Sequence, residues 1–408
     1  MKILLINHYA GNLTLGMEFR PYYLAKQWVK KGHEVTIVAA SYSHLRKQQP
    51  VVDKNITVEF LDDIKYVWIK TPIYNNSGVH RFINVIAFVI KLFIFNNKLI
   101  KESYPDVVIA SSTYPIDIYP AHRIAKKCNA KLCFELHDLW PLSPMEIGGY
   151  SKYHPFIMLM QAGENFACKK SEIVVSLLSN AKQYLIQHGM NPDKFHHIIN
   201  GYDANEIGLA IDIPQEHRDL LTKQKEEGKM IICYAGGINE PYALHTLALA
   251  VQNLQNAVIV FVGKGNVLVK LKSITYNLNL NNVFFLPIIE KRAIPTLFKL
   301  VDIGYVGFKK SDIFKYGISP NKITDYMLAG KPIILSADVE NEIVDRVSCG
   351  ITVPAEDPDA VKNAILKLSN LSEEDRKKMG EKGREYALRE LNYETLAQKF
   401  IQALGFYQ

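Results

Sequence analysis

The sequence predicts an α/β protein with two doubly wound domains, each built on a largely parallel sheet. Short continuous apolar runs of strand length alternate with amphipathic stretches of helix length along the whole chain. This alternation is typical of parallel strands that helices cover on both faces. The chain has 408 residues, which exceeds one domain of roughly 150 residues and favours two. Its 48% hydrophobic residues exclude a disordered or fibrous protein.

The first half contains five apolar runs that are expected to form strands. These runs span residues 2–7, 34–40, 106–110, 131–136 and 172–176. Amphipathic stretches at 17–31, 117–127 and 156–170 are expected to form the helices between them.

The second half repeats this pattern with six apolar runs, and it ends in a helical tail. The runs span residues 229–235, 257–262, 283–286, 302–306, 332–336 and 350–353. Turn-forming residues cluster at 200–206 and at Pro214, which places a domain boundary there. Residues 372–408 are expected to form two helices with a break near Leu391 and Asn392.

Charge and cysteine usage limit the class of protein further. Residues 1–200 carry 23 Lys and Arg against 15 Asp and Glu. This half therefore faces an acidic partner or has a basic solvated surface. The five cysteines contain no CxxC pair, so neither a disulfide framework nor a zinc site is expected, and a reducing cytoplasm fits. The apolar run at the N-terminus is too short for a signal peptide and predicts a buried strand.

One segment, 82–95, is unusually apolar, with only Asn84 and Lys91 interrupting it. As a helix it would span about 21 Å, which is less than the ~30 Å hydrocarbon layer of a bilayer. It is expected either to be a buried core helix or to lie in a membrane interface, with the cations Arg81, Lys98 and Lys101 near the headgroups.

The turn after the first strand contains two glycines, Gly11 and Gly16, before an amphipathic helix. Glycines permit tight turns, and a helix N-terminus presents unpaired N–H groups to an anion or a sugar hydroxyl. The spacing is not G-x-G-x-x-G, and no acidic residue follows the second strand, which disfavours a nicotinamide-dependent oxidoreductase. The turn is either a binding loop or a plain connection.

His137 and Asp138 follow directly after the strand expected at 131–136. Polar groups just past the carboxyl end of a parallel strand lie where ligands bind in open α/β sheets. The imidazole can donate to a developing oxyanion or a sugar hydroxyl, and the neighbouring carboxylate can fix its tautomer or accept a proton. A purely structural histidine is the alternative.

The second half offers a candidate site for a diphosphate. Glycine turns follow two of its strands, and an irregular loop around residues 317–320 opens a helix that carries Lys322 and Asp325 on one face. Backbone amides with a lysine suit a diphosphate, and a carboxylate one turn later suits a ribose diol. The glycines of the two turns are Gly236, Gly237, Gly263 and Gly265.

These features together resemble the family-4 glycosyltransferases, which are retaining sugar transferases of GT-B fold. The resemblance covers nearly the whole chain. It is most specific in Ser319-Pro-x-Lys322-x-x-Asp325-Tyr-Met-x-Ala-Gly-Lys-Pro332. The other matching motifs are Gly32-His-Glu-Val, His137-Asp138, Asn200-Gly-Tyr-Asp203 and Gly350-Ile-Thr-Val-Pro-x-x-Asp357-Pro358.

The resemblance implies two Rossmann-like domains that face each other across a cleft. Residues 1–205 would form the acceptor-binding domain, and residues 206–389 would form the donor-binding domain. The C-terminal helix, 390–408, would pack back onto the first domain.

The resemblance also implies roles for individual residues. His137, with Asp138 beside it, would stabilise the transition state near the donor sugar. Lys322 would meet the diphosphate, and Asp325 would bind the ribose. Gly11 and Gly16 would border the donor phosphate. The other donor-binding positions are Gly236, Gly237, Gly263, Gly265, Ile318 and Ser319.

The sequence departs from the family pattern at two places in the donor site. Gly317 stands where the family has the first Glu of its Glu-x7-Glu motif. Gly237 and Tyr242 stand where the family has an Arg and a Lys after the first strand of the second domain.

A metal is not expected. The Asp357-Pro-Asp359 sequence has the letters of a metal-binding D-x-D motif, but it precedes a helix, where acidic residues cap N–H groups. We expect metal-independent transfer without a cofactor, the nucleotide sugar being a substrate.

The resemblance implies a transferase that takes a sugar from a nucleotide diphosphate sugar, with UDP as the expected carrier. The acceptor would be a saccharide on a polyprenyl diphosphate, in the synthesis of bacterial O-antigen or capsule. The enzyme would be cytoplasmic, on the inner face of the plasma membrane through residues 80–101, without a nucleic-acid partner. The alternatives are a nucleotide-sugar epimerase of the same architecture and a non-catalytic two-lobed sugar-binding protein.

Overall fold

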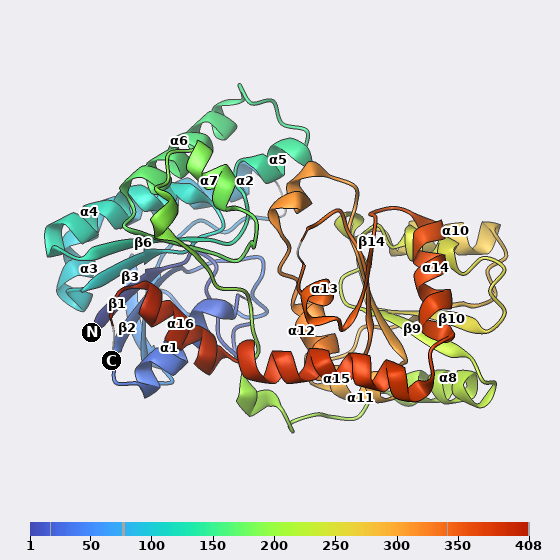
Figure 1. The fold of residues 1–408 in the computed structure, drawn as a ribbon. Helices are drawn as coiled ribbons and strands as arrows, with labels where there is room; N and C mark the ends of the chain where they lie inside the picture. The colour runs from blue at the N-terminus through green and yellow to red at the C-terminus, as the bar shows by residue number, and fades with distance from the viewer. Residues whose placement is uncertain (17, 76–77, 341, 407–408) are drawn as a thin grey trace. The chain divides into compact units, whose positions relative to one another are not determined.

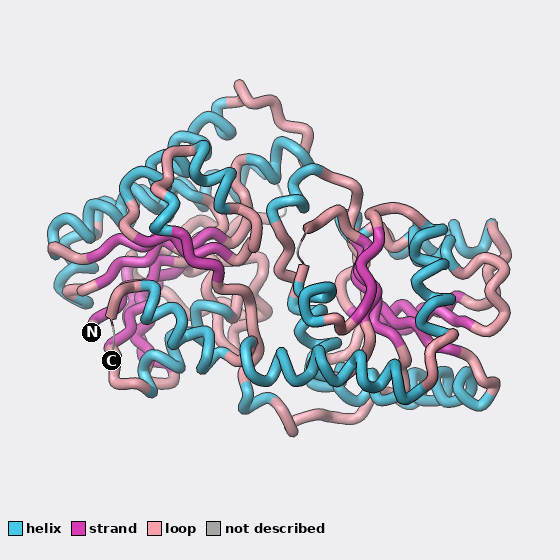
Figure 2. The backbone as a smooth tube through the Cα atoms, viewed as in Figure 1, coloured by secondary structure: helices cyan, strands magenta, loops and turns pink. Residues whose placement is uncertain are grey.

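The computed structural model describes residues 1–16, 18–75, 78–340 and 342–406. The chain divides into two compact units, of which the first comprises Met1–Asn200 together with Tyr393–Gln408, and the second comprises Gly201–Asn392. Figures 1 and 2 show the same architecture in each unit, a sheet with helices on both faces. This is the α/β class that the alternation of strands and helices predicts.

The first unit contains a twisted eight-stranded sheet in the order β3-β4-β2-β1-β5-β6-β7-β8. All neighbouring strands are parallel except β3 and β4, which form an antiparallel hairpin. The strands are β1 (Lys2–Ile6), β2 (Glu34–Ala40), β3 (Ile56–Leu61), β4 (Ile64–Ile69), β5 (Val107–Ala110), β6 (Lys131–Leu136), β7 (Ile173–Ser176) and β8 (Phe195–His197).

Eight α-helices and two short 3₁₀ turns belong to the described part of this unit. They are α1 (Arg20–Lys30), α2 (Gly78–Ile94), α3 (Asn96–Ser103), η1 (Pro115–Asp117), α4 (Ile118–Cys128), α5 (Leu142–Glu146), α6 (Pro155–Lys170), α7 (Lys182–Gln187), η2 (Pro192–Lys194) and α16 (Tyr393–Ala403).

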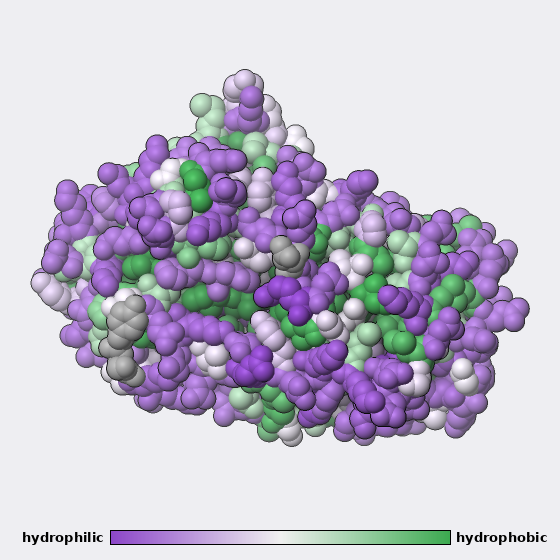
Figure 3. Space-filling view, viewed as in Figure 1, coloured by the Kyte–Doolittle hydropathy of each residue, from purple (hydrophilic) through white to green (hydrophobic). Residues whose placement is uncertain are grey.

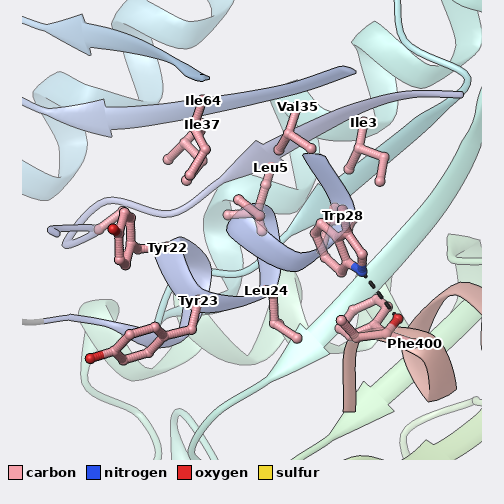
Figure 4. Packing of buried hydrophobic residues seen from close by; sticks show 14 of the residues in the cluster. Ile3, Leu5, Tyr22, Tyr23, Leu24, Trp28, Val35, Ile37, Ile64 and Phe400 are labelled. Carbon is pink, nitrogen blue, oxygen red and sulfur yellow. Dashed lines mark hydrogen bonds between the residues drawn. The ribbon is translucent and has the colours of Figure 1, made fainter. Parts of the chain in front are cut away.

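The C-terminal helix α16 packs against α1 within the first unit. The indole Nε1 of Trp28 donates a hydrogen bond to the carbonyl of Ala397 at 3.1 Å, and its ring meets Phe400 edge-on at 5.3 Å (Figure 4). Tyr23 stacks on Tyr393 at 4.9 Å. These rings and the apolar side chains of β1 and β2 form one buried core, so the last residues of the chain complete the fold of its first half.

The second unit has a six-stranded, fully parallel sheet in the order β11-β10-β9-β12-β13-β14. All six runs expected in the second half form strands. They are β9 (Met230–Ala235), β10 (Ala257–Val262), β11 (Val283–Leu286), β12 (Ile303–Gly307), β13 (Ile333–Ser336) and β14 (Gly350–Val353).

Helices and short 3₁₀ turns cover both faces of this sheet (Figure 1). They are η3 (Ala204–Glu206), α8 (Gln215–Glu226), η4 (Glu240–Tyr242), α9 (His245–Ala250), α10 (Leu268–Asn277), η5 (Lys291–Ala293), α11 (Ile294–Lys299), η6 (Asp312–Tyr316), α12 (Asn321–Leu328), α13 (Ile343–Val347), α14 (Pro358–Ser369) and α15 (Glu373–Glu390). The tail breaks between α15 and α16 at Leu391 and Asn392, as the sequence predicts.

Each sheet reverses its strand order at one point, between β1 and β5 in the first unit and between β9 and β12 in the second. In open α/β sheets, the crevice outside the carboxyl ends of the strands at such a point is where ligands bind. The candidate site residues are therefore expected at the carboxyl ends of the strands near these two points.

The apolar segment that the sequence singles out forms α2, which begins at Gly78. One face of α2 is buried through Val85, Phe88 and Leu92. The opposite face is exposed and also apolar, because Val79, Ile83, Ile90 and Ile94 are 48–70% exposed. The helix is therefore half core and half apolar surface, and its contact with a membrane interface stays a prediction.

Hydrophilic residues cover most of the face of the molecule that Figure 3 draws. Among the described residues, no single helix is long and apolar enough to cross a bilayer. Only α2 and α3 taken together reach that length and composition, and they are bent by 69° relative to each other.

Candidate functional site

A buried network of charged side chains lies at the carboxyl edge of the first sheet. His137 follows β6, and Ser111 follows β5. Glu18 lies in the connection between β1 and α1, and Arg20 is the first residue of α1. Glu135 is the penultimate residue of β6, with its side chain fully buried. The parallel topology therefore brings together residues that are more than 110 positions apart in the sequence.

Both nitrogens of the His137 ring face acceptors. Nδ1 lies 3.0 Å from Oε1 of Glu18, and Nε2 lies 3.3 Å from Oε2 of Glu135. The hydroxyl of Ser111 is 3.0 Å from Nε2 and donates to Glu135 Oε2 at 2.5 Å. The other oxygen of Glu135 accepts from Nε of Arg20 at 3.0 Å. Two buried cations thus alternate with two carboxylates.

These contacts set the charge of the network. Burial alone would lower the pKa of His137, but the carboxylates of Glu18 and Glu135 outweigh it and raise this pKa to about 10. Burial alone would raise the pKa of Glu135, but Arg20 and His137 lower it to about 2. At neutral pH, His137 is therefore an imidazolium. It can donate hydrogen bonds but cannot act as a base.

The stability of the protein should depend on pH through His137. Its pKa in the folded protein lies above the value of about 6.5 in an unfolded chain. The stability that it contributes is therefore fully present below about pH 6.5 and is lost as the pH rises towards 10. Urea unfolding at pH 6.5 and 9.5 should show a loss for the wild type that His137→Gln largely lacks. An equal loss in both proteins would contradict the assigned charge state.

The carboxylates that lie within 3.3 Å of the His137 ring nitrogens are those of Glu18 and Glu135. The role expected for Asp138 beside His137 stays a prediction. The sequence carries one signal for Glu135, since a carboxylate inside an otherwise apolar strand must find buried partners. No spacing rule connects Glu18 with His137.

The turn at Gly11 and Gly16 is closed by its own backbone hydrogen bonds. The amide of Gly11 donates to the carbonyl of Glu18 at 2.9 Å, and the amide of Gly16 donates to the carbonyl of Asn12 at 2.9 Å. Gly16 adopts a φ of +97°, which a glycine tolerates. Both amides therefore donate within the loop, and the expected place of this turn beside the donor phosphate stays a prediction.

In the second unit, the two glycine turns pack against each other at the carboxyl edge of the sheet. The amide of Gly236, after β9, donates to the carbonyl of Val262 at the end of β10. A Cβ on Gly263 would lie 1.9 Å from the carbonyl oxygen of Gly236, and one on Gly265 would lie 2.0 Å from that of Ile238. Side chains at these positions would push the turns apart.

The head of α12 reaches these turns. The side chain of Lys322, in the first turn of α12, passes so close to Gly236 that a Cβ there would lie 2.5 Å from its Cε. Ile318 and Ser319 lead into the helix, and Pro320 is its N-cap. The structure thus assembles Gly236, Gly237, Gly263 and Gly265 with Lys322.

Two backbone amides in this assembly are unused. Among the described residues, none accepts a hydrogen bond from the amide of Gly237 or of Gly265. Unpaired amides beside a lysine at a helix N-terminus can bind an anion.

Asp325 lies one turn further along α12 and lines a cavity of about 150 Å³ with Glu206 and Lys291. Burial raises the pKa of Asp325 to about 6, and Lys291 and Lys322 oppose this rise. Asp325 is half-buried, and a carboxylate in such a cavity suits hydrogen bonds from a diol.

Asp357 is the N-cap of α14 and accepts a hydrogen bond from the amide of Ala360 at 2.9 Å. This is the capping role expected for the Asp357-Pro-Asp359 sequence. In the described ranges, no group of three or more His, Cys, Asp or Glu residues is placed to hold a metal ion.

Comparison with known proteins identifies both halves of the chain. Residues 15–206 match the model described as Glycosyltransferase Family 4, and residues 217–386 match the model described as Glycosyl transferases group 1. The chain is 25% identical over 390 residues to the glycosyl transferase WcaI of Escherichia coli (strain K12), which is named for colanic acid biosynthesis. That alignment covers 92% of this chain and 93% of WcaI.

Solved structures of glycosyltransferases share the fold over essentially the whole chain. Anabaena HepE, solved in complex with UDP and glucose, superposes with a TM-score of 0.67 at 14% identity and 100% coverage of both chains. Sucrose-phosphate synthase from Thermosynechococcus elongatus gives a TM-score of 0.73 at 15% identity, with 98% of this chain and 97% of that chain covered. The chain therefore belongs to the glycosyltransferases of GT-B fold, as an enzyme in which a family 4 domain precedes a group 1 domain.

Proposed function

We propose that this enzyme transfers a sugar from a nucleotide diphosphate sugar, with UDP as the carrier, to a lipid-linked saccharide in bacterial surface polysaccharide biosynthesis. The observation that carries the donor half of this proposal is the assembly of Lys322 with the free amides of Gly237 and Gly265. A diphosphate needs a cation and preorganised N–H donors in one place, and the second unit offers both.

Two further observations support a nucleotide sugar as the donor. The carboxylate of Asp325 lies one helical turn beyond Lys322 on α12, which suits a ribose that follows a diphosphate. HepE was solved with UDP and with UDP-glucose. The fold alone does not choose the base, so UDP is the first candidate in the assay below.

Support for a lipid-linked acceptor comes from the first unit and from WcaI. The exposed apolar face of α2 suits contact with the membrane interface. The surplus of cations in residues 1–200 suits anionic headgroups. WcaI is named for colanic acid biosynthesis. We place the enzyme on the inner face of the plasma membrane.

The mechanism that we propose is metal-independent transfer with retention of the anomeric configuration. The leaving diphosphate gains negative charge as the sugar departs, and Lys322 with the two glycine amides would stabilise that charge. The imidazolium of His137 would act as a hydrogen-bond donor to a substrate. Because both its nitrogens already face Glu18 and Glu135, a substrate would have to take the place of the more exposed Glu18.

The experiment that tests the function is incubation with a panel of nucleotide sugars, with and without polyprenyl-diphosphate-linked saccharides. A transferase releases nucleoside diphosphate in the presence of its acceptor and forms an extended lipid-linked product. Conversion of a nucleotide sugar into a different nucleotide sugar would indicate an epimerase instead. Tight sugar binding without turnover across the panel would indicate a binding protein.

Membrane contact should depend on the apolar face of α2. The double variant Ile83→Glu/Ile90→Glu changes exposed positions and spares the core. Flotation with liposomes that contain anionic lipid should recover the wild type and lose most of this variant, because two charges enter the apolar face. Val269→Glu, at a 78% exposed position of the second unit, is the control and should float like the wild type. Equal flotation of all three proteins would contradict this role of α2.

A further inference from the structure

The ammonium group of Lys322 lies over the rings of two tyrosines. Its Nζ is 4.0 Å from the centroid of the Tyr242 ring and 5.3 Å from that of the Tyr234 ring. Tyr234 belongs to β9, and Tyr242 ends the short turn η4. Among the described residues, no carboxylate forms an ion pair with Lys322. The groups in direct contact with the ammonium are therefore the two aromatic faces, while the Asp325 carboxylate acts on it from beyond ion-pair distance.

The nearby Lys309 shows the contrasting arrangement. Its Nζ lies 2.8 Å from Oε1 of Glu240, two residues before Tyr242. A carboxylate that pairs with a lysine fixes the ammonium group and also neutralises its charge. An aromatic ring attracts the ammonium group but carries no net charge, so the positive charge of the lysine is not neutralised. Of these two lysines, Lys322 in the first turn of α12 is the one whose charge stays available to an anion.

The two rings are themselves firmly held. Tyr234 is fully buried, and its hydroxyl donates to the carbonyl of Gly237 at 2.5 Å. The amide of Tyr242 donates to the carbonyl of Asn239 at 3.1 Å. The Tyr242 ring contacts those of Tyr234 and Phe308, with centroids 5.9 and 5.8 Å away. These contacts give the lysine side chain, which otherwise samples many rotamers, a defined position.

We propose that Tyr242 is a positioning residue for the donor diphosphate. It holds the ammonium of Lys322 against the turn at Gly236 and Gly237, where the free amide of Gly237 also lies, before any ligand arrives. A cation that is already in place loses less entropy when the ligand binds, so the site binds the diphosphate more tightly. This inference rests on the proposed function, since it assumes that the ligand is a nucleoside diphosphate.

The test uses calorimetric titration of the full-length protein with UDP, repeated with GDP. Tyr242→Leu removes the ring and keeps an apolar side chain, so UDP should bind about tenfold more weakly, the scale of losing one desolvated cation–π contact. Tyr242→Phe keeps the ring face and removes only the hydroxyl. It should bind UDP within about threefold of the wild type.

The same titrations in a Lys322→Met background separate positioning from a general structural effect. If Tyr242 acts through Lys322, then Tyr242→Leu changes UDP affinity by less than about twofold once the lysine is gone. Melting temperatures of all variants check that each is folded.

The outcomes distinguish two failures. Binding of neither UDP nor GDP by the wild type would overturn the proposed function and this inference with it. Two results would overturn the inference alone, given that the wild type binds UDP. In the first, Tyr242→Leu binds UDP as tightly as the wild type. In the second, Tyr242→Leu weakens UDP binding by the same factor whether residue 322 is Lys or Met.

Discussion

Replacing Lys322 by Ala is expected to reduce turnover by about 10²-fold or more, the scale of removing one preorganised donor from developing negative charge. Its ammonium lies at the glycine turn after β9, and no described carboxylate lies within ion-pair distance of it. The loss should appear in kcat as well as in the donor KM, because the charge on the diphosphate grows in the transition state. Initial rates against donor concentration, with a verified acceptor, measure both constants.

Lys264→Ala is the matched control for this experiment. Lys264 lies in the neighbouring turn, between Gly263 and Gly265, but its side chain is exposed. Its removal should leave kcat within about threefold of the wild-type value. Wild-type turnover in Lys322→Ala would contradict the assigned role, and an equal loss in both variants would indicate a general field of positive charge.

Replacing Glu135 by Ala is expected to destabilise the first unit by about 3–5 kcal/mol, because it leaves two buried cations without their shared carboxylate. The side chain of Glu135 is fully buried, and that of Arg20 is 2% exposed. Urea unfolding at pH 7, followed by circular dichroism, measures this loss.

Glu18→Ala provides the matched comparison, since it removes the other carboxylate of His137. The Glu18 side chain is 22% exposed, so water can replace it, and the expected loss is no more than about 1 kcal/mol. Equal stability of Glu135→Ala and the wild type would show that the buried network does not support the fold.

Most of the fold could be predicted because its strands are buried on both faces and appear as continuous apolar runs. The hairpin of β3 and β4 was missed, since the polar residues Thr57 and Glu59 interrupt the apolar run of β3. Its turn did carry a signal, as Asp62 and Asp63 both adopt positive φ values of 51° and 62°, a conformation that Asp tolerates in tight hairpins. The three-residue strand β8 is too short for any pattern.

The candidate donor site was predictable to the extent that it is local in sequence. Lys322 and Asp325 share one helix, and each glycine turn follows its own strand, so strand ends and helix starts suffice to place them. The contact of Lys322 with Tyr242 could not be predicted, because 80 residues separate the two and only the sheet order β9-β12 brings them together. The partners of His137 were missed for the same reason.

Free amides were a second limit of sequence reasoning. Gly11 and Gly16 follow a strand, as the glycines after β9 and β10 do, so the sequence does not distinguish them. The amides of Gly11 and Gly16 nevertheless donate within their own loop. Whether the amide of a turn residue is free to bind a ligand depends on whether a carbonyl of the protein already accepts its hydrogen bond. No sequence pattern specifies that carbonyl.

A crystal structure of this protein with bound nucleoside diphosphate tests the central claim most directly. The account predicts that the diphosphate oxygens lie within hydrogen-bonding distance of Lys322 Nζ and of the amides of Gly237 and Gly265, with the ribose at Asp325. A diphosphate bound elsewhere, with Lys322 still over the Tyr242 ring and free of any phosphate contact, would contradict it.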